Sequence, residues 1–313
     1  KNKDEESNRL KNAIVALQGN ALAINNNLAE IIARESEIKE SFSMNQETEM
    51  VFVQTLKEKL YQWLVSHQNQ RTGLVVSFEG DYNLRTMSFV YDDALATIIY
   101  TLFGDYERAR LGLDFFLQRA ERLEHQGFYN AYYSNNGEVA EYAAHAGPNL
   151  WLGIAIAQFT NQTGDRKYLV VARHIADWIE TLQDAEGGIA GGRNMSWYST
   201  EHNLDGYAFF TMLYKVTREE RYKMNAEKIL RWLEKYAYGN EEIPIHRGKG
   251  DATIATDTYA WSIAALGPAL LEQRGMSLDQ IAKFAIEHCA VTTTFNNRFG
   301  KAVTVSGFDF AKP

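Results

Sequence analysis

The sequence predicts an all-α protein in which helical hairpins pack side by side and curl into a solenoid or a closed toroid. Two copies of one hairpin occur, because Asn149-Leu150 returns as Asn203-Leu204 and Trp178-Ile179 returns as Trp232-Leu233 at the same spacing. Short turns alternate with long loops along the chain, and no Pro- or Ser-rich linker divides it. We therefore expect a single domain over residues 1–313.

The individual elements follow from apolar periodicity and from capping signals. Apolar residues between 10 and 41 predict an N-terminal helical segment within residues 1–45, and the hairpin repeats are expected over residues 46–313. The first helix of that part runs from about Glu47 to His67. Inner helices are expected to start near Asp92, Pro148, Glu201 and Thr256, and outer helices near Tyr106, Asp165, Glu219 and Ser277. The candidate N-caps are Asp105, Asp165, Ser199, Thr200, Thr256 and Ser277. Val303-Thr304-Val305 is a candidate edge strand.

The long connections lie at one end of the predicted hairpins, the end where the inner helices begin. They cover residues of about 68–90, 125–146, 184–200 and 237–254. Loops of this length are uncommon in a compact domain unless they carry a function. This end is therefore the expected functional face.

Composition excludes several classes of function. The net charge is −8 without a basic stripe, which argues against nucleic acid as a partner, and no apolar run is long enough to span a membrane. The single cysteine cannot form an internal disulfide. No zinc, phosphate-loop or dinucleotide motif occurs, so we expect neither a metal nor a cofactor. No leader is readable at Lys1, and we favour a bacterial secreted, periplasmic or surface-anchored protein over a cytoplasmic one.

The predicted starts of the inner helices carry a dense set of polar and aromatic residues. Acids in a first helical turn are favoured by the helix dipole alone. However, Glu201 and Asp205 are four residues apart and share one helix face. Asp93, Asp205 and Asp257 are expected at matching positions of their hairpins, with Trp151 in the remaining copy. A ring of hairpins would bring such acids together across one mouth.

Paired carboxylates are what the cleavage of a glycosidic bond requires, one protonated to donate to the leaving oxygen and one ionised to activate water. The predicted acid/base set is therefore Asp93, Glu201 and Asp205. An aromatic share of 12% fits either helix packing or a surface that stacks on sugar rings. The predicted substrate-binding residues are Tyr91, Asp92, His145, Asn149, Trp151, Trp197, Tyr198, His202, Asp257 and Trp261.

The inner-helix openings resemble those of the six-hairpin glycosidase superfamily. The residues that carry the resemblance are 91–96 (YDDALA), 147–152 (GPNLWL) and 199–205 (STEHNLD), together with Trp178 and Trp232. The resemblance implies an (α/α)6 toroid, carbohydrate bound at the mouth, acidic catalytic residues and no organic cofactor. Such a ring needs about 12 helices, and the sequence predicts about nine from Glu47 onward plus one or two before it. Either the N-terminal segment completes the ring, or the ring is incomplete at the C-terminus.

The sequence leaves several functions open. The first is a glycoside hydrolase of the inverting type that acts on an oligo- or polysaccharide with paired carboxylates. The second is a polysaccharide lyase or sugar epimerase on the same fold, with Tyr198, His145 or His202 as acid/base groups and with Arg193 or Arg247 binding a uronate. The third is a non-catalytic glycan-binding protein. An isoprenoid-type enzyme is less well supported, because Asp92-Asp93 alone does not make a diphosphate motif. The oligomeric state is also open.

Overall fold

The computed structural model describes residues 46–123, 126–238, 243–297 and 299–312. The N-terminal helical segment predicted within residues 1–45 lies outside the described residues. In the described part no helix is both long and apolar enough to cross a membrane.

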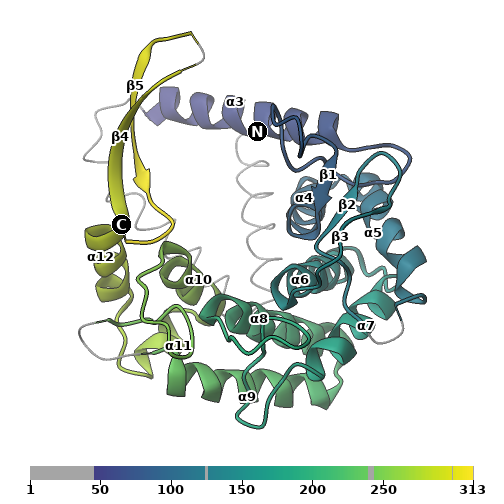
Figure 1. Cartoon of the computed structure of the whole chain (residues 1–313), viewed down its shortest axis with the longest axis vertical. Helices are drawn as coiled ribbons and strands as arrows, with labels where there is room; N and C mark the ends of the chain where they lie inside the picture. Colours follow the sequence, from purple (N-terminus) through teal and green to yellow (C-terminus); the bar gives the residue numbers. More distant parts are fainter. Residues whose placement is uncertain (1–45, 124–125, 239–242, 298, 313) are drawn as a thin grey trace.

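Helical hairpins succeed one another around an open ring (Figure 1). The inner helices are α4 (Val90–Phe103), α6 (Ala146–Thr163), α8 (Thr200–Thr217) and α10 (Thr256–Leu266), and each packs on the next. The outer helices α5 (Tyr106–Ala120), α7 (Leu169–Glu180) and α9 (Glu220–Tyr236) each pack on the inner helix that precedes them. Helix α3 (Gln46–His67) precedes the hairpins, and α11 (Pro268–Glu272) and α12 (Leu278–Cys289) follow α10. The predicted rhythm of inner and outer helices is therefore confirmed.

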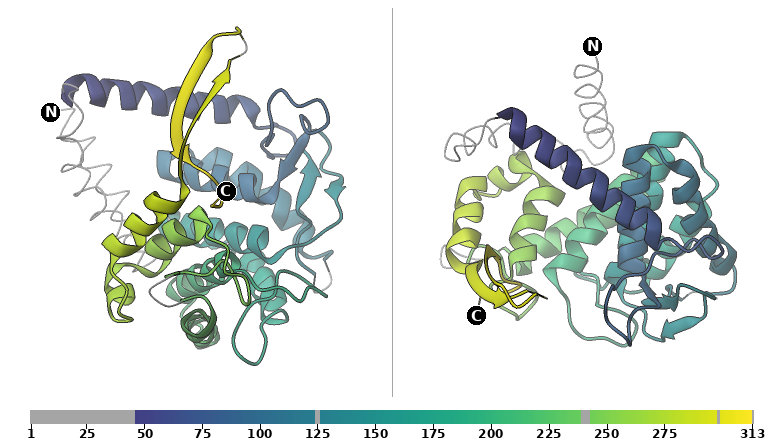
Figure 2. Two further views of the ribbon diagram at one scale, coloured as in Figure 1. Left: turned by 60° about the vertical axis from the view of Figure 1, so that its left-hand side comes forward. Right: turned by 90° about the horizontal axis from the view of Figure 1, so that it is seen from above.

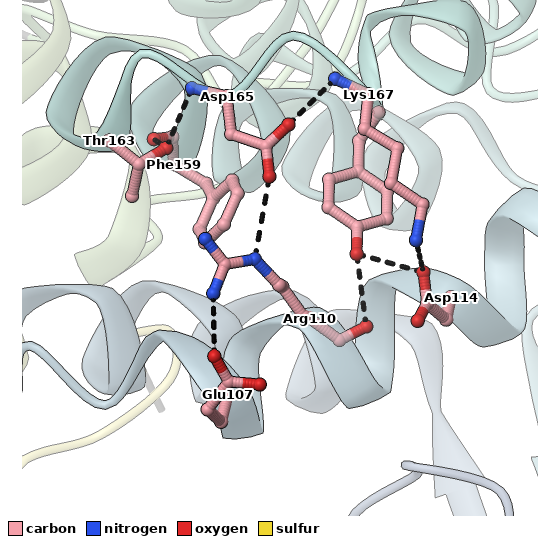
Figure 3. A network of polar contacts seen from close by, with 8 residues as sticks. Glu107, Arg110, Asp114, Phe159, Thr163, Asp165 and Lys167 are labelled. Carbon is pink, nitrogen blue, oxygen red and sulfur yellow. Dashed lines mark hydrogen bonds and ion pairs between the residues drawn. The ribbon is translucent and has the colours of Figure 1, made fainter.

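Three of the six candidate caps hold, whereas Thr200 and Thr256 are the first residues of α8 and α10 and not their N-caps. Asp105, Ser199 and Ser277 each accept a hydrogen bond from a backbone N–H in the first turn of their helices. Asp165 does not cap α7, which begins only at Leu169. Its carboxylate instead accepts from the Lys167 backbone N–H at 3.0 Å and from Arg110 Nε at 3.4 Å (Figure 3). The cap prediction failed because Gly164 is followed by a short turn and not directly by the helix.

Small β elements lie among the loops and after the last helix. Strands β1 (Met87–Phe89), β2 (Ala131–Tyr133) and β3 (Val139–Glu141) form an antiparallel sheet in that order within the loops at the mouth. Strands β4 (Ala290–Asn296) and β5 (Ala302–Phe308) pair antiparallel along their whole length. This hairpin contains the predicted edge strand and projects beyond the helices (Figure 2). It is longer than the sequence analysis indicated.

The core lies between the inner and outer helices. The repeated residues Trp178 and Trp232, with Tyr168 and Tyr222, are at most 2% exposed. They pack with the apolar faces of α6 and α8, so the sequence repeat is primarily a repeat of core packing. Lys167 Nζ and the Tyr168 hydroxyl both contact Asp114 Oδ1, at 2.6 and 2.8 Å (Figure 3). These contacts connect the residues just before α7 to α5.

Candidate active site

The four inner helices named above can be aligned residue by residue from their first residues, which count here as position 1. The backbone N–H at position 1 donates to a backbone carbonyl further along the chain in every case, at 2.7 to 2.9 Å; the acceptor lies in the following long loop for α4, α6 and α8 and just after β5 for α10. The pairs are Val90 with Asn130, Ala146 with Gly191, Thr200 with Arg247, and Thr256 with Phe310. This repeated bond establishes the register independently of where a helix is taken to begin.

Position 4 of each inner helix holds the preceding loop in place. Asn149 Oδ1 accepts from the Phe128 backbone N–H at 2.7 Å, and Asn203 Oδ1 accepts from that of Ile189 at 2.8 Å. Tyr259 makes the corresponding contact by donating its hydroxyl to the Ile245 carbonyl at 3.0 Å. Asn149, predicted to bind substrate, is therefore a fully buried loop anchor.

Asp93 occupies position 4 as well, so its predicted match to Asp205 and Asp257 is wrong. Asp93 Oδ1 accepts from the Val75 backbone N–H at 2.8 Å, and Oδ2 lies 2.7 Å from Ser88 Oγ. Burial raises the pKa of Asp93 to about 7. Both oxygens are thus used within the loop before α4, and the structure does not bring Asp93 to the other predicted acids. The prediction failed because sequence alone did not establish the register, which places Asp93 at position 4, Asp257 at position 2 and Asp205 at position 6.

Position 2 brings chemically active side chains together. It is occupied by Tyr91 on α4, Gly147 on α6, Glu201 on α8 and Asp257 on α10. The Tyr91 hydroxyl donates to Glu201 Oε1 at 3.3 Å, although α6 lies between the two helices. A Cβ atom at Gly147 would lie 2.0 Å from the Tyr91 hydroxyl and 2.5 Å from His202 Nε2. The contact therefore exists because Gly147 has no side chain, a role that the sequence analysis missed.

The two carboxyls at position 2 influence each other. Burial raises the pKa of Glu201, the charge of Asp257 raises it further, and Tyr91 and Arg247 oppose the shift. Burial also raises the pKa of Asp257, against the backbone N–H of Thr258 and the charge of Arg247. Both side chains are partly exposed. Two interacting acids do not both ionise as easily as isolated acids, so the pair favours a state with one protonated and one ionised carboxyl.

Position 6 lies one helical turn further along, on the same face as position 2. It carries Leu95, Trp151, Asp205 and Trp261. Trp261 Nε1 donates to Asp205 Oδ1 at 2.8 Å, and the rings of Trp151 and Trp261 stack at 5.1 Å with 26° between their planes. Asp205 is 0% exposed. Burial raises its pKa well above the usual range, the charge of Glu201 adds to this, and Trp261 and Trp151 oppose it.

An aromatic and histidine cluster adjoins the carboxyls. The Trp197 ring, 45% exposed, lies 5.3 Å from that of His202 and 6.1 Å from that of His145. Burial, with His145 adding, lowers the pKa of His202 to about 4, so its imidazole is neutral. His202 Nδ1 has no hydrogen-bond partner within the described residues. His145 Nδ1 is 3.1 Å from Asn130 Nδ2.

The remaining predicted residues lie apart from this group. Tyr198 packs beside Trp232, with ring centroids 6.0 Å apart, and Arg193 is exposed. Asp92 lines a pocket of about 170 Å³ between α3 and α4, together with Trp63, Leu95 and Ile99, and neither Glu201 nor Asp257 lines it. As for metals, the part of the chain that the structure describes contains no group of three His, Cys, Asp or Glu residues that could hold an ion.

Comparisons with known proteins bear on the fold. No protein-family model and no curated protein matches the sequence. Among solved structures, a protein described as a wild-type glycosidase has a TM-score of 0.62 at 9% identity and covers 80% of this chain and 74% of its own. A D-mannose isomerase has a TM-score of 0.60 at 17% identity with the same coverage. A sugar epimerase from a ruminal bacterium has 0.56 at 14%, over 74% of this chain and 68% of its own. The described part of the chain thus shares the (α/α)6 toroid fold of these solved structures.

Proposed function

We propose that the protein is a carbohydrate-active enzyme, and specifically a glycoside hydrolase whose two working carboxyls are Glu201 and Asp257. The observation that carries this proposal is their shared position 2 on neighbouring inner helices, where both are partly exposed and the charge of Asp257 raises the pKa of Glu201. Asp257, first predicted to bind substrate, takes the catalytic place first given to Asp93. Solved structures with the same fold include glycosidases, which is compatible with this chemistry.

The surroundings of each carboxyl suggest its role. Glu201 has the raised pKa of a general acid and lies beside the Tyr91 hydroxyl, so it would donate its proton to the leaving glycosidic oxygen. Asp257 accepts a hydrogen bond from the Thr258 N–H at 2.8 Å and experiences the charge of Arg247. It would therefore act as the ionised base that takes a proton from the attacking water. The products are a reducing sugar and an alcohol, and direct attack by water inverts the anomeric centre.

A second candidate, sugar epimerisation or isomerisation, is favoured by the neutral and buried His202 beside Tyr91. Such a reaction moves a proton on carbon and needs a neutral imidazole or phenol near the sugar. Structures with this fold include a D-mannose isomerase and a cellobiose 2-epimerase. Incorporation of deuterium from D2O into unreacted or epimerised sugar, without new reducing ends, would favour this candidate over hydrolysis.

The test is a panel of neutral and uronate oligosaccharides assayed for reducing ends. We expect release from at least one glycan, and a loss of about 100-fold or more in kcat for Glu201→Gln and for Asp257→Asn. Asp114→Asn, an acid on the outer helix α5, is the matched control and should retain turnover. Glycan binding by calorimetry without any product would instead indicate a non-catalytic glycan-binding protein. Full activity of both carboxamide variants would refute the proposed pair.

A further inference from the structure

Asp205 has an unusual environment for a carboxylate. Its Oδ1 has one donor, the Trp261 indole, and its Oδ2 has no hydrogen-bond partner among the residues described by the structure. The charged groups that act on it are the acids Glu201 and Asp257, and the side chain is completely buried. An ionised carboxylate in such a place would be strongly destabilised, whereas a neutral acid is tolerated there.

The two tryptophans on either side of Asp205 form a continuous aromatic unit. Trp151 comes from α6 and Trp261 from α10, and Asp205 lies on α8, which packs between those helices. Both rings are partly exposed. They are at position 6 of their helices, four residues beyond position 2, where Glu201 and Asp257 lie on α8 and α10; four residues are a rise of about 6 Å. A pyranose ring that contacts the indole surface would therefore lie next to the two carboxyls.

We propose that Asp205 is a positioning residue that holds the Trp261 indole and thereby sets the Trp151–Trp261 pair as the stacking surface for a sugar ring beside Glu201 and Asp257. This inference rests on the proposed function and deepens it, because it identifies the substrate of the same site as a pyranoside with an apolar face. Aromatic rings bind such faces through CH and dispersion contacts, and a hydrogen bond to the indole restricts the ring to one orientation. Asp205 then acts on the substrate through these tryptophans.

The experiment compares Asp205→Asn, Asp205→Ala and Trp261→Phe. Thr160→Ala is the matched control, because Thr160 is a buried polar residue at the far end of α6. The first measurement is KM and kcat on the active glycan. The second is the affinity for the released sugar, followed by tryptophan fluorescence, which does not depend on turnover. Near-UV circular dichroism of each variant reports whether the tryptophans remain ordered.

We expect Asp205→Ala to raise KM and weaken sugar binding about tenfold, with a smaller loss in kcat. Asparagine still presents an acceptor to the Trp261 indole, so Asp205→Asn should recover most of this loss. Trp261→Phe should weaken sugar binding similarly, and its combination with Asp205→Ala should add little, because both changes remove one contact.

Two results would overturn the positioning role. One is a loss of kcat in Asp205→Asn as large as that in Glu201→Gln, with unchanged sugar affinity, which would make Asp205 an ionised catalytic group. The other is sugar binding in Asp205→Ala equal to that in Thr160→Ala. A failure of the proposed function can be distinguished from a failure of the positioning role, because in that case the Glu201→Gln and Asp257→Asn variants would remain active. If Asp205→Ala does not fold, Asp205→Asn and Trp261→Phe still decide between these outcomes.

Discussion

Replacing Asp93 by asparagine should stabilise the protein at neutral and alkaline pH and leave its activity intact. Ser88 Oγ lies 2.6 Å from the Val75 carbonyl and 2.7 Å from Asp93 Oδ2, but a serine hydroxyl has only one proton. If that proton goes to the carbonyl, Asp93 must supply the second one. An asparagine amide supplies it permanently, and asparagine already occupies the equivalent positions 149 and 203.

The magnitude follows from the pKa. Burial raises the pKa of Asp93 to about 7 in the folded state, against about 3.9 in an unfolded chain, so the folded state binds the proton more tightly. The stability that depends on this proton is complete below about pH 4 and is lost as the pH rises through about 7. The full difference is at most about 4 kcal/mol, and about 3 kcal/mol of it develops between pH 5 and pH 8.

Urea unfolding of the wild type and of Asp93→Asn at pH 5, 6, 7 and 8 measures this effect. The free energy of unfolding of the variant should exceed that of the wild type increasingly as the pH rises. The difference between the two proteins isolates Asp93 from other titrating groups. A difference that is constant with pH would refute the buried proton, and loss of turnover in a folded Asp93→Asn would restore Asp93 to the catalytic set.

Three further outcomes follow from the inner-helix positions. Gly147→Ala should lower kcat about 100-fold with little change in fold, measured by turnover beside circular dichroism, because the new Cβ displaces the Tyr91 hydroxyl from Glu201. Wild-type kcat in this variant would show that the contact is dispensable. Asn203→Ala should lower the free energy of unfolding by about 3 kcal/mol, measured in urea, because it leaves the backbone of Ile189 unpaired; a change near zero would exclude the anchoring role. Turnover should fall as the pH rises through the raised pKa of Glu201, since a general acid works only when protonated, and a pH–rate profile flat on the alkaline side would contradict this.

Much of the architecture could be predicted from sequence because the repeat is a core repeat. Trp178 and Trp232 are buried at equivalent places, and large buried side chains tolerate little variation in spacing. Starts of helices were predicted to within a few residues where a proline or a capping side chain marks them, as Pro148 and Ser199 do. Asp165 shows the limit, because a polar residue after a glycine can begin a turn as well as a helix.

The site was predicted less completely for a physical reason. The functional face depends on register between helices, and a shift of two residues along a helix turns a side chain by about 200°. Asp93 and Asp257 therefore looked equivalent. However, Asp93 contacts the loop before α4, whereas Asp257 interacts with Glu201. Gly147 gave no signal at all, because its role lies in the space that it leaves for Tyr91. Neither feature can be read from one residue and its neighbours in sequence.

The most direct test of the central claim is a structure of Glu201→Gln with an oligosaccharide bound. We predict that the glycosidic oxygen lies within about 2.6–3.2 Å of the amide introduced at position 201, with a water held by Asp257 on the opposite face of the sugar. The sugar ring should rest against Trp261. An oligosaccharide bound elsewhere, with position 201 and Asp257 both out of contact with it, would contradict the account.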